Sequence, residues 1–258
     1  MRDEAHGVRS FVISRLDGQP FDPYEPGAHI DVACPSGVTR PYPLCGDPAR
    51  RDSHLFAVKR EASSRGGSRS LHDNVQIGTE LSVGAPRSLF RLAEGTRKHV
   101  LIGACIDITP LLSMAYGLVA LGAPFELHYF ARSAERAAFL PLLSRAAFEA
   151  HVTLQIGIEP AALDAYLSDV PQDTHVYTCG PVPFMDHVVA VGEARVPADA
   201  IHLERFAAEP QPASRDARQS FDVQLASTGQ TVRMDSSTSI VEATRDLRRQ
   251  IASEIEHK

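Results

Sequence analysis

The sequence predicts two folded parts, a small antiparallel β-barrel followed by a doubly wound α/β domain. Residues 8–92 contain short β-type segments bounded by Gly, Pro, Asp or Ser, and this spacing is typical of a barrel. From residue 99 onward, continuous apolar runs alternate with helical patterns, as in a parallel sheet covered on both faces. A polar, proline-containing stretch at 207–219 then separates a last segment. The expected divisions are a barrel at 1–95, an α/β domain at 96–207, a linker at 208–220 and a remnant at 221–258.

Composition excludes some classes of function. The chain has 258 residues, enough for two cores. Its formal net charge of −6 argues against nucleic acid as a partner, because neutralising phosphates needs clustered Lys and Arg. No apolar run approaches the roughly 18–20 residues of a membrane span, and the first ten residues contain no apolar leader segment. We therefore expect a cytoplasmic enzyme or binding protein without a membrane partner. Its oligomeric state stays open.

The expected barrel strands are short, and closing them into a barrel removes exposed edges. One helix is expected among them, around 68–75, with Ser68 or Ser70 as its N-cap. The strands are expected at 8–14, 28–35, 39–45, 54–60 and 80–86.

The α/β part should place its ligands at the carboxyl ends of its strands. After 220, a hairpin turning at Thr228 and Gly229 and a final helix are too little for an independent core. The α/β strands are expected at 99–104, 125–131, 152–157 and 175–180, and the helices at 110–121, 135–147, 161–169 and 183–195.

A first candidate site lies in "RPYPLCGD", where Arg40, Tyr42 and Leu44 share one face of a strand. Arginine offers a fork for a phosphate, and tyrosine offers a flat surface for an aromatic ring. Together they could hold the two ends of a flavin mononucleotide. On this stretch alone, a surface arginine and a half-buried tyrosine are the simpler interpretation.

A second candidate lies in "SRGGSRSLHD". Gly66 and Gly67 let the backbone approach a ligand, and Ser68 can donate a hydroxyl and an amide at a helix N-terminus. Lys59 and Arg60 add positive charge from the preceding strand. The alternative is an ordinary capped helix after a turn.

Five stretches occur in the order of a known family's motifs: "RPYPLCGDP", "SRGGSRSLHD", "LIGACIDITP", "YTCGPVPFM" and "HLERFA". On these stretches the chain resembles the reductase components of Rieske-type oxygenases and O-demethylases. This is the family of phthalate dioxygenase reductase and vanillate O-demethylase reductase. The resemblance implies a ferredoxin-reductase-like fold, FMN and NADH as cofactors, and hydride transfer from NADH to FMN. Single electrons would then pass to an iron–sulfur cluster.

The resemblance also implies roles for single residues. Arg40 and Tyr42 would hold FMN, whose phosphate would lie at Gly67 and Ser68, and Phe206 would cover the flavin ring. The remaining implied contacts to FMN or NADH come from Pro43, Leu44, Lys59, Gly66, Thr109, Pro110, Arg132, Ser133, Cys179, Gly180 and Pro181. Arg132 would serve either NADH or NADPH.

Two departures from the family affect its binding motifs. Pro43 stands where the family has serine, and proline has neither a hydroxyl nor an N–H to donate. Ala104, Cys105 and Asp107 stand where the nucleotide loop has glycines. Their side chains oppose close approach of a diphosphate, so NADH binding is in question. Thr109 as N-cap, with proline next, still starts a helix with or without a nucleotide.

The C-terminal segment departs further. "FDVQLASTGQTVRMDSSTSIVEATRD" looks like the first hairpin and helix of the family's ferredoxin domain, but the C-x₄-C-x₂-C run is absent. We expect no iron–sulfur cluster in this chain, through natural loss or shortening. The family's first barrel strand is also expected to be shortened or absent before residue 2. The four cysteines are Cys34, Cys45, Cys105 and Cys179, and their spacing fits no metal site.

Three functions remain open. The main hypothesis is an FMN-dependent NAD(P)H oxidoreductase that passes electrons to a separate small-molecule or protein acceptor, such as an oxygenase. A second is a non-redox enzyme that uses the cleft between the domains, and a third is a non-catalytic binding partner. If the cleft performs acid–base chemistry, Asp107, Cys105 and Cys179 are the candidate catalytic groups, with a raised carboxyl pKa as the expected sign.

Overall fold

The computed structural model describes residues 1–62, 66–157, 160–206, 221–224 and 231–234. The chain divides into two compact units, Met1–Arg205 and Phe206–Lys258, and each is described by itself. No helix within the described ranges is long and apolar enough to cross a membrane.

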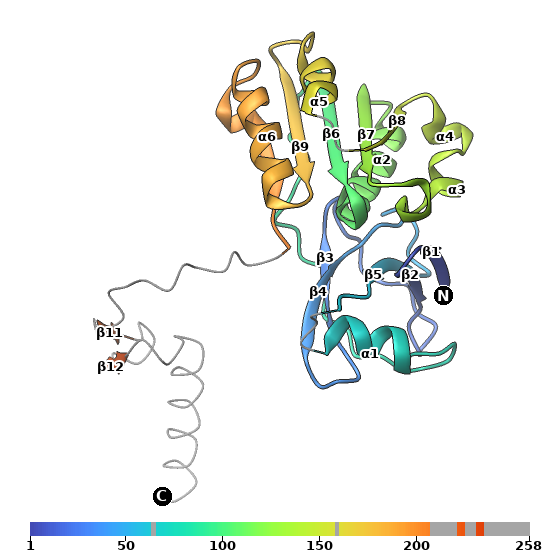
Figure 1. Cartoon of the computed structure of the whole chain (residues 1–258). Coiled ribbons are helices and arrows are strands. Elements are labelled where there is room, and N and C mark those ends of the chain that lie inside the picture. The colour runs from blue at the N-terminus through green and yellow to red at the C-terminus, as the bar shows by residue number, and fades with distance from the viewer. Residues whose placement is uncertain (63–65, 158–159, 207–220, 225–230, 235–258) are drawn as a thin grey trace, which may run out of the picture. The chain divides into compact units, whose positions relative to one another are not determined.

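The N-terminal half of the first unit is antiparallel (Figure 1). One sheet has the order β1-β2-β5, and a separate ribbon pairs β3 with β4. An isolated bridge between Leu44 and Phe56 connects the ribbon to the sheet. The elements are β1 (Arg2–Ala5), β2 (Val8–Ile13), β3 (His29–Ala33), β4 (Thr39–Pro43), β5 (His54–Lys59) and α1 (Gly67–Asn74).

Alternation along these strands builds the barrel core, because every second side chain points inward. Phe11 and Phe56 stack in it with ring centroids 5.2 Å apart, and Ile30 and Leu44 are fully buried beside them. Leu71 of α1 joins the same cluster and fixes the helix against the barrel. The position of α1, and so of its N-terminus, follows from this packing.

Three expectations for this half need correction. The segment 80–86 is not a strand, because Val83 makes only an isolated bridge to Val32. Neither Ser68 nor Ser70 caps α1, because Gly66 is its N-cap and no side chain makes a cap hydrogen bond. Residues 2–5, which were not expected to be extended, form β1 against β2.

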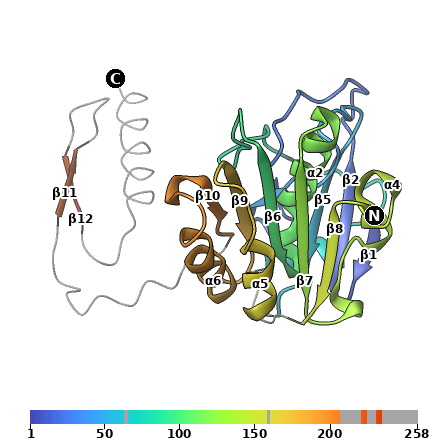
Figure 2. The ribbon, with the colours of Figure 1, turned by 90° about the horizontal axis from the view of Figure 1, so that it is seen from above.

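The second half is a five-stranded parallel sheet in the order β10-β9-β6-β7-β8 (Figure 2). The strand order reverses between β6 and β9, so the loops that follow these two strands meet at the switch point where such sheets bind ligands. The strands are β6 (Lys98–Ala104), β7 (Phe125–Ala131), β8 (Val152–Ile156), β9 (Thr174–Cys179) and β10 (Ile201–Glu204). The fold class predicted from the sequence is confirmed.

Helices cover both faces of this sheet. In Figure 2, α5 (Pro160–Leu167) and α6 (Val182–Glu193) lie on one face, and α2 (Thr109–Leu121) lies between the other face and the antiparallel strands. The arrowheads of β6 and β9 in Figure 1 point toward the antiparallel half. The switch point therefore faces the barrel.

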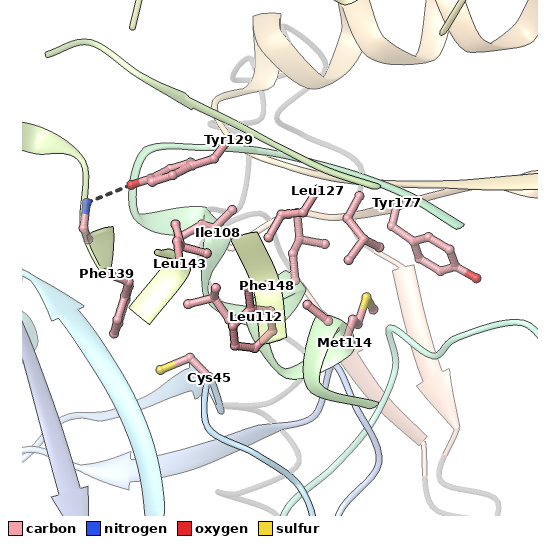
Figure 3. Packing of buried hydrophobic residues seen from close by; sticks show 14 of the residues in the cluster. Cys45, Ile108, Leu112, Met114, Leu127, Tyr129, Phe139, Leu143, Phe148 and Tyr177 are labelled. Carbon is pink, nitrogen blue, oxygen red and sulfur yellow. Dashed lines mark hydrogen bonds between the residues drawn. The ribbon is translucent and has the colours of Figure 1, made fainter. Parts of the chain in front are cut away.

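One apolar cluster joins the two halves (Figure 3). Cys45 from the barrel lies in it together with Leu112 and Met114 of α2 and Phe139. The backbone N–H of residue 27 in the barrel also donates to the Ser113 hydroxyl at 2.8 Å in a buried contact. Helix α2 is thus held by both halves, which fixes the loop before it.

The expected helix at 135–147 is wrong. It is replaced by η2 (Ala134–Arg136), α3 (Leu140–Leu143) and α4 (Ala146–Glu149). Phe139 has a left-handed φ of 64°, which a continuous right-handed helix does not allow. Its ring is buried, so packing holds this conformation in place. Strand β10 was also not anticipated.

In the second unit, β11 (Phe221–Gln224) pairs antiparallel with β12 (Thr231–Met234). These strands are the two arms of the expected hairpin. The expected turn at Thr228 and Gly229, the linker and the final helix lie outside the described residues.

Candidate functional site

Arg40 and Tyr42 lie on β4 with one residue between them, so both side chains leave the same face of the ribbon. Tyr42 is half-buried, with its ring 5.7 Å from the ring of Phe56. Burial raises the pKa of the Tyr42 phenol, which also shares a hydrogen bond with the Cys34 thiol. Tyr42 is therefore a neutral, fixed surface against which a planar group can lie.

The N-terminus of α1 lies directly against Arg40. A Cβ built on Gly67, the first residue of α1, would be 3.2 Å from the Cγ of Arg40 and 3.5 Å from the Sγ of Cys34. Glycine therefore allows this approach without displacing the side chain of Arg40. The preceding residue, Gly66, has a φ of 104°, which side chains rarely adopt. The sequence places two glycines where the backbone needs them.

This arrangement suits an anion. Arg40 donates to the Thr39 carbonyl at 2.9 Å, and no carboxylate pairs with it among the described residues. The hydroxyl of Ser68 accepts the backbone N–H of Glu61 at 3.2 Å, so its own proton remains available. The positive end of α1 and the Ser68 hydroxyl thus lie in the stretch where the sequence predicted a phosphate, and the stem of Arg40 packs against the same helix start.

Three other expected flavin contacts do not belong to this anion site: Lys59, Pro43 and Leu44. Lys59 pairs with Glu61 at 2.6 Å and faces the loop after β6. Pro43 is buried at the end of β4. Leu44 is buried in the barrel core, and its N–H donates to Ala28.

The loop after β6 has kept the backbone conformation of a glycine without the glycine. Cys105 has a left-handed φ of 57°, one of two such non-glycine residues described. The loop forms η1 (Cys105–Ile108), a 3₁₀ turn that continues directly into α2. Figure 3 shows its last residue, Ile108, buried near Tyr129 and Leu143. The packing of Ile108 in the apolar cluster therefore holds the turn in place.

The expected cap of α2 is wrong. Ile108 holds the N-cap position, and Thr109 is already helical. The hydroxyl of Thr109 donates to the Ile106 carbonyl at 3.1 Å, inside the turn. The 3₁₀ turn brings that carbonyl within reach, which the sequence pattern did not reveal.

Asp107 lies in the same turn. Burial raises the pKa of its carboxyl to about 6, against a lowering by Lys59 and a further raising by Glu61. Within the described residues it has neither a hydrogen bond nor an ion pair. Asp107 is an unpaired carboxyl at the switch point that titrates near neutral pH.

Cys179 ends β9 beside this turn, and it is fully buried. Its thiol donates to the Glu204 carbonyl at 3.2 Å. Burial raises the pKa of Cys179, and the charges of Asp107 and Glu204 raise it further. The thiol therefore stays protonated at neutral pH, which makes it a weak nucleophile.

Gly180 and Pro181 continue from Cys179 into α6. A Cβ on Gly180 would lie 2.7 Å from Phe184 and 3.1 Å from the Cβ of Ala104. Glycine at this position lets the ends of β6 and β9 approach each other. Pro181 is the N-cap residue of α6.

Glu204 was missed by the sequence analysis. It ends β10 in register with Cys179, and its Oε2 is buried without a hydrogen-bond partner in the described structure. Burial raises the pKa of its carboxyl to about 7. The only signal in the sequence was its place in "HLERFA", two residues before Phe206.

The last three expected binding residues are Arg132, Ser133 and Phe206. Arg132 is exposed after β7 and close enough to Cys105 to lower the pKa of that thiol, although burial raises it overall. Ser133 hydrogen-bonds Glu135. Phe206 begins the second unit, so its place relative to the flavin site is not described.

Comparison with known proteins places these features in context. No family model matches the chain. It is 43% identical to the vanillate O-demethylase oxidoreductase of Pseudomonas putida, over 93% of this chain and 76% of that protein. Among solved structures, phthalate dioxygenase reductase, titled a modular structure for electron transfer from pyridine nucleotides to 2Fe-2S, matches with a TM-score of 0.78.

That match is 32% identical and covers 95% of this chain and 77% of the reductase. An intact type IV self-sufficient cytochrome P450 monooxygenase matches with a TM-score of 0.85 and 31% identity, over 95% of this chain and 32% of the monooxygenase. In that larger protein, the shared part is one portion of a longer chain.

Proposed function

Because the chain belongs to the family of vanillate O-demethylase oxidoreductase and phthalate dioxygenase reductase, we propose that it moves electrons from NAD(P)H through a flavin to a separate oxygenase-type acceptor. The observation that carries the proposal is the side-chain stem of Arg40 packed on the first residue of α1, which brings a cationic side chain to the start of that helix. This packing supports an anion site next to a half-buried phenol, in a fold that the electron-transfer relatives share.

We infer that the flavin is FMN. A helix N-terminus together with an unpaired arginine suits a terminal phosphate, which carries up to two charges. Ser68 adds a hydroxyl donor. Tyr42, one pleat along β4 from Arg40 and about 7 Å away along the strand, supplies a flat surface for a ring. The residues present fit the group.

A bound flavin supplies hydride acceptance and single-electron release, and the protein's own groups orient it and control protons. Pro43 closes the end of β4 without offering a donor. Cys179 contributes a protonated thiol, whose S–H already donates a hydrogen bond to the Glu204 carbonyl. Burial raises the pKa of Glu204 to about 7, so this carboxyl can gain or lose a proton near neutral pH. It is therefore the group beside Cys179 suited to proton exchange.

The nucleotide is proposed to bind at the loops after β6 and β9. Cys105 preserves the left-handed course that the family's glycine gives to this loop. Gly180 keeps the two strand ends close. The charge of Asp107 opposes a diphosphate at the same place, so we expect weak binding of NADH when this carboxyl is ionised.

The electron acceptor is proposed to be a separate protein or small molecule. No group of three or more metal-ligating side chains was found among the residues that the structure describes. The relatives named above are an O-demethylase oxidoreductase, a dioxygenase reductase and a monooxygenase whose own chain includes the shared part. An oxygenase is the acceptor class that this family favours.

Flavin retention tests the proposal. The protein is reconstituted separately with FMN and FAD, passed through a desalting column and measured by absorbance, and NADH-dependent reduction of ferricyanide is then assayed. We expect FMN to be retained and Arg40→Ala to weaken its binding by about 10- to 100-fold, the loss of a charge-assisted phosphate contact.

Arg50→Ala is the matched control, because Arg50 is an exposed barrel arginine paired with Asp52 and should leave FMN affinity unchanged. Equal FMN retention by both variants would contradict the assigned phosphate site. Absence of NADH-dependent activity in the FMN-loaded protein at every pH tested would contradict the reductase function.

A further inference from the structure

Asp107 is not explained by the proposed function. It lies at the switch point, in the turn that leads into α2. Its carboxyl is largely withdrawn from water, yet the described residues give it no hydrogen bond and no ion pair. The hydroxyl of Thr109, two residues further on, is donated to the Ile106 carbonyl. A buried carboxyl without a partner costs stability.

The start of α2 offers few free backbone N–H groups to an anion. The backbone N–H of Thr109 is donated to the Ile106 carbonyl, and Pro110 has no N–H. The first two helical positions therefore contribute no open amide, so the helix dipole acts with reduced support from direct donors. A diphosphate placed here is unusually sensitive to a neighbouring negative charge.

Several charged and titratable groups lie around Asp107. Those that face it are Lys59, Glu61, Tyr129, Cys179 and Cys105. Lys59 and Glu61 are oppositely charged and bonded to each other at 2.6 Å, so their effects on a nearby anion largely cancel. Burial raises the pKa of Tyr129 and of both thiols, so all three stay neutral between pH 5 and 8. Glu204, whose charge acts on Cys179 from β10, has its pKa raised to about 7 by burial and also titrates in this range. Asp107 is the changing charge within the turn itself.

We propose that Asp107 makes nucleotide binding depend on a proton: the loop accepts the dinucleotide when this carboxyl is neutral and resists it when the carboxyl is ionised. The inference rests on the proposed function, because it concerns the same nucleotide site. A neutral carboxyl can donate its O–H to a phosphate oxygen, whereas a carboxylate can only accept. One proton is therefore taken up with each nucleotide bound above the pKa of the carboxyl.

The expected size follows from Coulomb's law. A carboxylate about 4 Å from a phosphate charge weakens binding by roughly ten- to a thousandfold, depending on how well water screens the pair. Between pH 5.5 and 8, we expect at least a tenfold rise in the Kd of the nucleotide, because Asp107 changes from mostly protonated to ionised over this range.

ADP-ribose is the suitable probe. It carries the diphosphate without the nicotinamide or a 2′-phosphate, so its own charge is constant between pH 5.5 and 8 and no electron transfer occurs. Binding to the whole FMN-reconstituted chain is measured by isothermal titration calorimetry at both pH values, in two buffers of different ionisation enthalpy. The difference between the buffers counts the protons taken up.

Asp107→Asn is expected to bind ADP-ribose with a much smaller pH dependence and less proton uptake, and about as tightly at pH 8 as the unaltered protein at pH 5.5. Asp107→Gly should behave alike and guards against an effect specific to asparagine. The control is Asp169→Asn, an exposed carboxyl between α5 and the amino end of β9, away from the carboxyl ends of the strands, which should keep the pH dependence.

Binding by the unaltered protein that does not depend on pH, or an undiminished pH dependence in Asp107→Asn, would overturn the proposal while leaving the nucleotide site intact. If ADP-ribose binds to neither the unaltered protein at pH 5.5 nor the two Asp107 variants, the proposed nucleotide site fails as well. Melting curves of each variant establish that the protein compared is folded.

Discussion

Replacing Cys105 by glycine removes backbone strain from the turn between β6 and α2. A residue with a Cβ at φ 57° pays about 1–2 kcal/mol for the left-handed conformation. Glycine avoids this cost but loses about 0.5–1 kcal/mol more chain entropy on folding. The difference predicts that Cys105→Gly raises the free energy of unfolding by about 0.5–1 kcal/mol. For a folded unit of about 200 residues, this corresponds to roughly 1–4 °C in Tm.

Thermal melting followed by circular dichroism, with urea unfolding at 25 °C, measures both quantities. Cys105→Ala is the matched control, because alanine removes the thiol but keeps the Cβ that causes the strain. We expect no stabilisation from it. An equal gain in the two variants, or a loss of stability in Cys105→Gly, would refute the strain argument.

Three further predictions concern neighbouring positions. Gly67→Ala places a Cβ 3.2 Å from the Cγ of Arg40, so we expect about tenfold weaker FMN binding with a Tm within a few degrees of the unaltered protein; unchanged affinity by fluorescence titration would show that this contact does not position Arg40. Gly180→Ala places a Cβ 2.7 Å from Phe184, and the overpacking should cost about 1–3 kcal/mol in urea unfolding; a cost below about 0.5 kcal/mol would mean that the ring moves aside. Glu204 has its pKa raised to about 7 in the folded protein, so its ionisation lowers stability progressively between pH 4.5 and 7. Glu204→Gln should therefore match the unaltered protein at pH 4 and exceed it at pH 8, by about 1–2 kcal/mol after screening by solvent; an equal gain at both pH values would show that the carboxylate charge is not the cause.

Local sequence patterns predicted most of the elements of the fold. The run at 125–131 matches β7, and the apolar residues before Cys105 form β6, because a strand buried on both faces needs little beyond continuous hydrophobicity. Failures occurred where tertiary packing overrides local preference. The segment 135–147 has helical composition, but Phe139 is buried in a left-handed conformation within the apolar cluster and divides it.

The candidate site was predictable to a similar degree. Arg40 and Gly67 were paired by analogy with a family, and the structure brings them into contact. Glu204 could not be found from pattern, because its burial and its register with Cys179 exist only after β10 joins the sheet. The unpaired state of Asp107 likewise depends on a 3₁₀ turn that directs the Thr109 hydroxyl elsewhere.

The most direct test of the electron-transfer function is an anaerobic titration of the FMN-loaded protein with NADH, followed by flavin absorbance at pH 5.5 and pH 8. We expect the yellow absorbance to bleach with about one NADH per flavin, at a lower NADH concentration at pH 5.5 than at pH 8. Bound flavin that remains oxidised under excess NADH at both pH values would contradict the account.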